Sequence, residues 1–109
     1  MRYLILLWGD AKAEAALPPD ERRRIVGEHM ELSARLREAG TLVAGEPLAP
    51  GGKLVRGGLV TDGPFVETKE QLGGFYLVDV ESEAAALAVA REIPASPGLV
   101  AEVRAVPAT

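Results

Sequence analysis

The chain has 109 residues, a length typical of one domain with one modest hydrophobic core. With 48% hydrophobic and 26% charged residues, its composition is that of a globular protein rather than a disordered one. A formal net charge of −4 argues against a nucleic-acid partner, because phosphate binding depends on clustered Lys and Arg. The basic run Arg22-Arg23-Arg24 fans over most of a helical turn, which is typical of a solvated helix start.

The residue counts also bear on metals and membranes. The chain has no cysteine and one histidine, which excludes disulfides and Cys-ligated zinc and argues against a catalytic zinc site. We therefore expect no metal and no cofactor. The apolar run near the amino terminus is too short to span a membrane and has no small-residue cleavage site behind it. We expect a cytoplasmic protein without a membrane partner.

The first half of the chain predicts a strand and a long helix. Residues 2–8 are apolar on both faces of a strand, which indicates a central position in a sheet. The following Ala-rich segment to Leu17 has no assigned structure beyond a possible helical turn. A helix then begins near Pro18 and runs to Ala39, with Gly40 just past its end. Its apolar stripe, made by Ile25, His29, Leu32 and Leu36, contains the single histidine at its centre.

The second half predicts short strands and a second helix. The expected strands cover residues 41–44, 53–61, 74–80 and 99–106, and a helix from Glu83 to about Ile93 is capped by Ser82. Residues 45–52 read as a turn-rich loop, and Gly57-Gly58 suggests a bulge or a tight turn inside the 53–61 segment. In the last strand, Leu99, Ala101, Val103 and Ala105 are expected to face inward.

This order of elements is typical of an α+β domain of the ferredoxin-like kind, an antiparallel sheet with two helices on one face. We interpret residues 1–109 as one such domain. One face of the sheet is then left without cover, and the strands at 2–8 and 74–80 are apolar on both faces. A second copy of the chain laid against that face would bury it, so the sequence predicts a homodimer.

The stretch from Leu59 to Val80 carries the most informative motif. Asp62-Gly63-Pro64-Phe65 combines a turn-capping side chain, a permissive glycine and a proline with fixed φ, and therefore predicts a rigid loop. With the residues that follow, Glu67-Thr68-Lys69-Glu70-Gln71-Leu72-Gly73-Gly74-Phe75, and with the amino-terminal strand, it resembles the YCII-related proteins of the DGPF-motif branch. The resemblance runs nearly from end to end.

The resemblance implies a dimeric α+β barrel and small bacterial cytoplasmic proteins whose biochemical roles are mostly unassigned. In the YCII branch proper, a histidine of the first helix and a nearby aspartate are proposed as a catalytic pair, and His29 occupies that helix position. The aspartate expected soon after the second strand is missing, since residues 45–52 contain Glu46 but no Asp. Asp62 could replace it if the fold brings the two residues together.

Two classes of function fit these residues. In the first, an enzyme acts on a small organic molecule, with His29 and Asp62 as catalytic residues and Arg22, Phe65, Glu67 and Lys69 as binding residues. In the second, the same pocket or a dimer surface serves a ligand-binding or regulatory protein without chemistry, since members of this branch are often linked with alternative sigma factors. Each residue also has a structural interpretation: His29 as a satisfied core histidine, Asp62 as a turn cap, Phe65 as an anchor for the loop, and Glu67 with Lys69 as a solvated face.

We expect His29 and the Asp62-Gly63-Pro64-Phe65 turn to border one cavity, because His29 is the polar group of a stripe that must face the sheet. Ser33 lies one turn beyond His29, but the amides around a mid-helix serine are already used in helix hydrogen bonds. They cannot form an oxyanion hole, so we reject a serine hydrolase. Whether the protein is an enzyme stays open at this point.

Overall fold

The computed structural model describes residues 1–63 and 70–108. The elements follow the order β1 (Arg2–Asp10), α1 (Ala11–Ala15), α2 (Pro19–Glu38), β2 (Leu42–Pro47), β3 (Lys53–Arg56), β4 (Leu59–Asp62), β5 (Glu70–Asp79), α3 (Glu83–Arg91) and β6 (Val100–Ala105). Strands β2, β5, β1 and β6 form an antiparallel sheet in that order, and β3 pairs with β4 in a separate two-stranded sheet. This is the predicted ferredoxin-like α+β arrangement, with the β3–β4 hairpin added to it.

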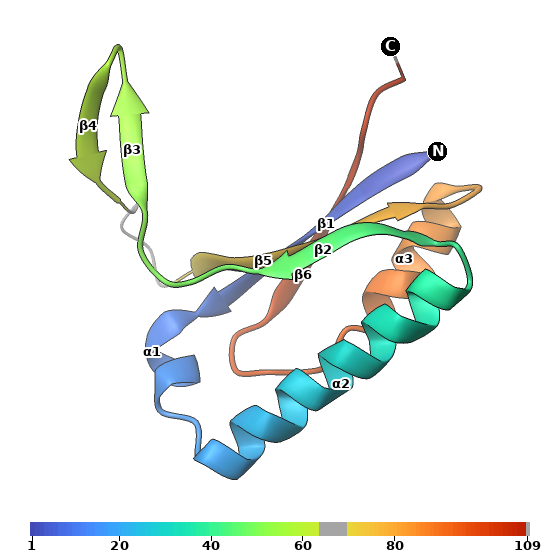
Figure 1. The fold of residues 1–109 in the computed structure, drawn as a ribbon, viewed down its shortest axis with the longest axis horizontal. Helices are drawn as coiled ribbons and strands as arrows, with labels where there is room; N and C mark the ends of the chain where they lie inside the picture. Colours follow the sequence, from blue (N-terminus) through green and yellow to red (C-terminus); the bar gives the residue numbers. More distant parts are fainter. Residues whose placement is uncertain (64–69, 109) are drawn as a thin grey trace.

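The core lies between the sheet and the helices α2 and α3, which both pack on one face of it (Figure 1). Strand residues alternate between faces, so Tyr3, Ile5 and Leu7 of β1 are buried toward the helices. Leu32 and Leu36 of α2 meet them there. As predicted, β1 is central, with β5 and β6 on its two sides.

The helix boundaries agree closely with the residues that favour them. Helix α2 has proline in its first turn, as predicted, and Gly40 follows its end with a φ of 75°. Helix α3 is capped by Ser82, whose Oγ accepts a hydrogen bond of 3.1 Å from the backbone N–H of Ala85. The Ala-rich segment after β1 forms the short helix α1, capped by the carboxylate of Asp10.

Strand β2 continues to Pro47, through part of the predicted loop, because it pairs with β5 as far as Gly74. Of the two alternatives at Gly57-Gly58, the tight turn is observed: both glycines have positive φ, 55° and 83°, so that the 53–61 segment is a hairpin. Ala105 lies on the inward face with Ala101 and Val103, but as the last residue of β6 it is exposed.

Within the described part of the chain, no layer of helices lies over the other face of the sheet (Figure 1). By alternation it carries Leu4, Leu6 and Trp8 of β1, all partly exposed, and the Trp8 indole N–H donates a 3.1 Å hydrogen bond to Glu102 Oε1. The β3–β4 hairpin and the carboxyl-terminal segment both project on this side. The hairpin exposes Val55, Leu59 and Val60, each by more than half.

The hairpin also explains the open shape of the molecule. The radius of gyration is 15.1 Å, whereas a compact chain of this length has about 13 Å. The base of the hairpin is closed by a hydrogen bond of 2.8 Å from the Gly63 N–H to the Gly52 carbonyl.

Among the described residues, none of the helices combines the length and the apolar composition that crossing a lipid bilayer requires.

Candidate functional site

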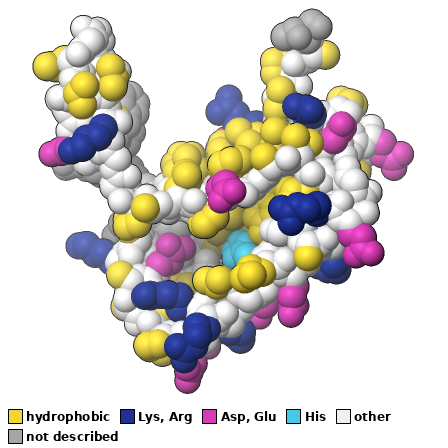
Figure 2. Space-filling view, in the orientation of Figure 1, with side chains coloured by type: hydrophobic (Ala, Val, Ile, Leu, Met, Phe, Trp, Pro, Cys, Tyr) yellow, Lys and Arg dark blue, Asp and Glu magenta, His cyan; other side chains and the backbone are white. Residues whose placement is uncertain are grey.

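A cavity of about 350 Å³ opens between α2, the end of β2 and the middle of β5. Its lining consists of Leu7, Val26, His29, Met30, Ser33, Arg37, Gly45, Glu46, Pro47, Gly73, Gly74, Phe75 and Tyr76. The space exists partly because β5 turns Gly74, which has no side chain, toward the helices, two residues before Tyr76. In Figure 2, His29 lies at the floor of this hollow, with hydrophobic, acidic and basic side chains around it.

An irregularity in the sheet borders the same cavity. The pairing of β1 with β5 shifts between Leu7 and Trp8, so that Gly73 is left without a partner on β1. Such bulges bend a strand and change the direction of neighbouring side chains, and they are frequent beside functional sites. Gly73 is therefore the bulge residue of β5 and lies at the wall of the cavity.

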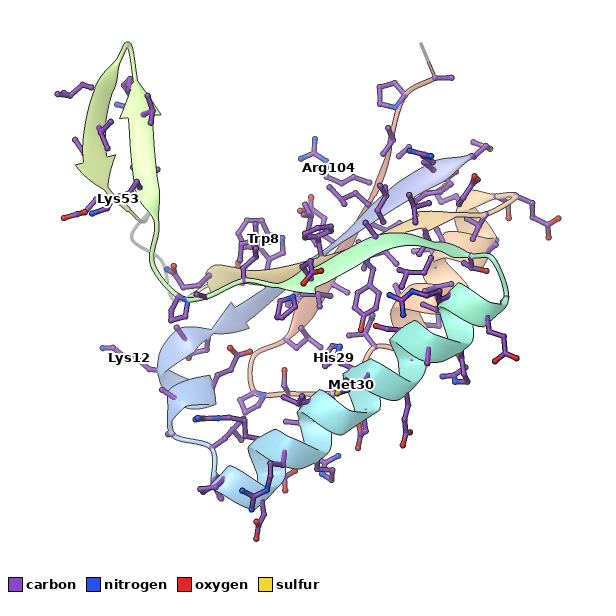
Figure 3. All side chains as sticks on the ribbon, in the orientation of Figure 1. Trp8, Lys12, His29, Met30, Lys53 and Arg104 are labelled. Carbon is purple, nitrogen blue, oxygen red and sulfur yellow. The ribbon has the colours of Figure 1, made fainter. Side chains whose placement is uncertain are left out.

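His29 is half-buried and points from α2 toward the sheet (Figure 3). Its Nδ1 atom lies 2.6 Å from the phenol oxygen of Tyr76, and the two rings are stacked with their centroids 5.9 Å apart. Burial lowers the pKa of His29 below its ordinary value of 6.5, and the nearby carboxylate of Glu28 opposes this effect only in part. At neutral pH the imidazole is therefore uncharged.

Tyr76 is almost fully buried and fixes the position of the histidine ring. Burial raises the pKa of Tyr76 above its ordinary value of 10.0, and a hydrogen bond from the Ser33 side chain lowers it in part. Ser33, Tyr76 and His29 thus form one hydrogen-bonded chain that joins α2 to β5. Because Nδ1 of His29 is occupied by the phenol, Nε2 is the nitrogen that remains for a ligand.

A second cavity of about 230 Å³ lies on the other side of His29. Leu7, Val26, His29 and Gly73 line both cavities, which makes the histidine a shared wall. Arg22 lines the second cavity, and its guanidinium donates hydrogen bonds of 3.2 Å to the carbonyls of Glu14 and Ala15 at the end of α1. Arg22 therefore holds the short helix α1 in place beside this cavity.

The family to which the chain belongs follows from two comparisons. The model of the YCII-related domain matches residues 1–109. The chain is also similar to an uncharacterized protein of Rhizobium meliloti (strain 1021), with 35% identity over 99 residues that cover 85% of this chain and 80% of the relative. The chain belongs to the YCII-related family.

Within this YCII-related chain, the predicted site residues fall into three groups. His29 and Arg22 both line the second cavity. Asp62 ends the β3–β4 hairpin, where its exposed carboxylate forms an ion pair with Lys53, and it lines neither cavity. The structure does not bring Asp62 to His29 within this chain, because the hairpin stands away from the sheet (Figure 1). Phe65, Glu67 and Lys69 lie outside the described residues.

The sequence also contained signals for residues that the prediction missed. Ser33 and Arg37 follow His29 by one and two helical turns, so helical periodicity places all three along one line. Tyr76 alternates with Gly74 and Val78 on the side of β5 that faces the helices. Glu46 belongs to β2 rather than to a loop, so its backbone borders the cavity, while its pairing with Phe75 puts its side chain on the other face of the sheet. Tyr76 is thus the hydrogen-bond partner of His29, a role for which an aspartate was expected.

No group of three or more His, Cys, Asp and Glu side chains suited to a metal ion occurs among residues 1–63 and 70–108. The polar side chains that line the cavity with His29 are instead a phenol, a hydroxyl and a guanidinium, from Tyr76, Ser33 and Arg37. This set can hydrogen-bond an organic molecule, and a neutral imidazole can exchange a proton with it.

Proposed function

We propose that this YCII-related protein binds a small organic molecule in the cavity beside His29, and that His29 exchanges a proton with that molecule. The observation that carries the proposal is the 2.6 Å contact between His29 Nδ1 and the buried Tyr76 hydroxyl at the wall of a cavity of about 350 Å³. An apolar cavity with a few convergent polar groups is the usual form of a small-molecule site.

The chemistry of His29 supports the second half of the proposal. A general acid or base works best with a pKa near the operating pH, and the lowered pKa of His29 keeps its imidazole neutral and able to accept a proton at pH 7. Tyr76 holds the ring through Nδ1, as a carboxylate does in many other histidine sites. Tyr76 is therefore a positioning residue, and His29 is the group that meets the ligand.

The first experiment is a ligand screen. A set of small organic acids, amines, amides and amino acids is tested for an increase in the thermal unfolding temperature of the native protein. A ligand of the cavity should lose most of its effect in Met30→Arg, which fills the cavity mouth, and keep it in Leu87→Arg on α3. If no compound stabilises the native protein, or if Met30→Arg leaves every effect unchanged, the cavity is not a binding site.

Proton exchange is then tested directly. A ligand with an acidic C–H bond is incubated with the protein in D2O, and incorporation of deuterium is followed by NMR. We expect exchange with the native protein and none above background with His29→Gln, which should still bind the ligand. Binding without exchange in the native protein would support a ligand-binding protein without chemistry, the alternative reading of the sequence.

We also propose that the protein is a homodimer of the DGPF-motif branch, with the uncovered sheet face as the interface. Four strands about 4.8 Å apart and about six residues long give a face of roughly 400 Å², which is about half of what each partner of a stable complex buries. The β3–β4 hairpin projects on the same side and exposes apolar side chains, so it can supply the rest of the contact. A second copy fits because it offers the same apolar face.

A further inference from the structure

We infer that the ligand of the His29 cavity is a small organic anion, a carboxylate with an apolar body, and that Arg37 binds its charged group. The inference rests on the proposed binding function and narrows its ligand class. It starts from the charge of the cavity wall. Arg37 lines the cavity from α2, and the other described side chains that face it are apolar or uncharged. Glu46 borders the cavity through its backbone, because its pairing with Phe75 turns its side chain to the other face of the sheet.

The geometry of α2 directs Arg37 toward this cavity. Val26, Met30, Ser33 and Arg37 all line it, and their spacing of four, three and four residues places them on one face of the helix. Long side chains of a helix lean toward its amino terminus, so the side chain of Arg37 is directed back over the turn that contains Ser33. His29 lies one helical turn, about 5.4 Å, before Ser33. A ligand of a few heavy atoms can therefore contact both the guanidinium and the imidazole.

Arg37 differs from the other arginines of its helix. Arg22 binds two carbonyls of α1, whereas Arg23, Arg24 and Arg35 form ion pairs with carboxylates. Within residues 1–63 and 70–108, Arg37 forms no ion pair and no side-chain hydrogen bond. A guanidinium at a cavity wall without such a partner is free to bind a ligand carboxylate through two parallel hydrogen bonds.

The rest of the lining selects an apolar body. Val26 and Met30 line the cavity, and both expose more than half of their surface to solvent. A ligand with an aliphatic or aromatic group would cover this surface. His29 Nε2 adds one hydrogen bond to a second polar atom of the ligand. Carboxylic acids with an apolar group and a further polar atom, such as N-acyl amino acids, combine these features in a size that about 350 Å³ can hold.

The test uses three matched probes and calorimetric titration. N-Acetyl-L-leucine is an anion, N-acetyl-L-leucinamide is neutral and L-leucinamide is a cation, and all three share one side chain. The full-length native protein should bind the anion at least about tenfold more tightly than the neutral amide, which corresponds to about 1.4 kcal/mol. It should bind the cation most weakly. The same derivatives of L-phenylalanine form a second series with a larger apolar group.

Three variants assign the charge. Arg37→Gln should lower the affinity for N-acetyl-leucine about tenfold, to that of the neutral amide, and leave the affinity for the amide unchanged. Arg37→Lys keeps the charge but lacks the planar fork, so it should retain part of the preference. Arg23→Gln changes an ion-paired cation of the same helix outside both cavities, and it should leave all affinities unchanged.

A structural role of Arg37 predicts a different result. Arg37 lies in the last turn of α2, where a cation offsets the helix dipole. If this were its whole role, Arg37→Gln would lower the unfolding temperature without changing the order of the three affinities. Salt gives a second readout, because the guanidinium is exposed. In about 1 M salt, where the Debye length is about 3 Å, the preference of the native protein for the anion should shrink.

The outcomes separate this inference from the proposed function. If the ligand screen finds cavity ligands but the neutral amide or the cation binds as tightly as the anion in both series, the anionic ligand is wrong and the binding function stands. A screen whose cavity ligands include amines or amides but no acids has the same meaning. Equal binding of N-acetyl-leucine by the native protein and Arg37→Gln overturns the role of Arg37. If no compound of the screen binds, the proposed function and this inference both fail.

Discussion

The Nδ1 atom of His29 lies 2.6 Å from the phenol oxygen of Tyr76, and this contact joins the centre of α2 to the middle strands of the sheet. The tyrosine is buried and the histidine is half-buried, so the bond is shielded from competition with water. Both residues also line the cavity. The contact therefore serves the packing of the helix and the orientation of the imidazole at once.

The first prediction concerns the stability supplied by this bond. Tyr76→Phe keeps the ring but removes the hydroxyl, which leaves the Nδ1 atom of His29 without its partner. We expect the free energy of unfolding to fall by about 1 to 3 kcal/mol, the cost of an unsatisfied buried polar atom, as measured by urea denaturation. Tyr3→Phe is the matched control, because Tyr3 is equally buried and should tolerate the change. Equal losses in the two variants would contradict this role of Tyr76.

The second prediction concerns the pKa of His29, followed through its ring protons by NMR. The midpoint should lie below 6.5, because burial disfavours the charged imidazolium. In Tyr76→Phe the midpoint should stay low, since the burial remains. A return to 6.5 in that variant would show that the hydrogen bond, and not burial, lowers the pKa.

The same pKa shift makes stability depend on pH. Between the folded pKa and 6.5 the unfolded chain binds a proton at His29 and the folded chain does not, so the free energy of unfolding rises with pH across this window. The contribution is fully present above 6.5 and is lost as the pH falls. Acidification from pH 7.5 to pH 5 should therefore lower the free energy of unfolding of the native protein more than that of the His29→Gln variant, as measured by urea denaturation at each pH. If the free energy of unfolding changes with pH in the same way in both proteins, the lowered pKa of His29 is contradicted.

The third prediction is that the protein is a dimer built on the uncovered sheet face. Light scattering on a size-exclusion column at micromolar concentration should give twice the chain mass of 11.5 kDa. Leu6→Lys places a charge on that face and should give a monomer, whereas Leu87→Lys on α3, on the helical side, should leave the dimer intact. If the native protein is a monomer, the proposed dimeric α+β barrel is wrong.

The fourth prediction is that the protein binds no transition metal, because one histidine and no cysteine leave only oxygen-rich sites. Elemental analysis of protein purified without a histidine tag should show less than one equivalent of zinc or iron per ten chains, an order-of-magnitude threshold for stoichiometric binding. Treatment with a chelator should leave the unfolding temperature unchanged. A tightly held equivalent of metal per chain would overturn this.

The fold was predictable because its signals are local and periodic. The run in β1 that is apolar on both faces, the apolar stripe of α2 and the Ser82 cap each depend on a few neighbouring residues, and the structure confirms the central strand and both helices. The site was predictable only in part. Helical geometry placed His29 facing the sheet, but its partner depends on the register between α2 and β5, which sequence spacing does not contain. The expected partner, Asp62, is the last residue of a hairpin whose direction no local pattern reveals.

The way the β3–β4 hairpin is attached makes it a separable module of the chain. Gly52 and Gly63 meet at its base, and none of its own residues belongs to the hydrophobic core. An isolated two-stranded hairpin is only marginally stable, so in a single chain its amides should exchange with solvent far sooner than those of β1. Changes in the length or sequence of the hairpin therefore do not disturb the packing of the hydrophobic core. In the proposed dimer, a change in the hairpin would therefore alter the interface without altering the residues that line the His29 cavity.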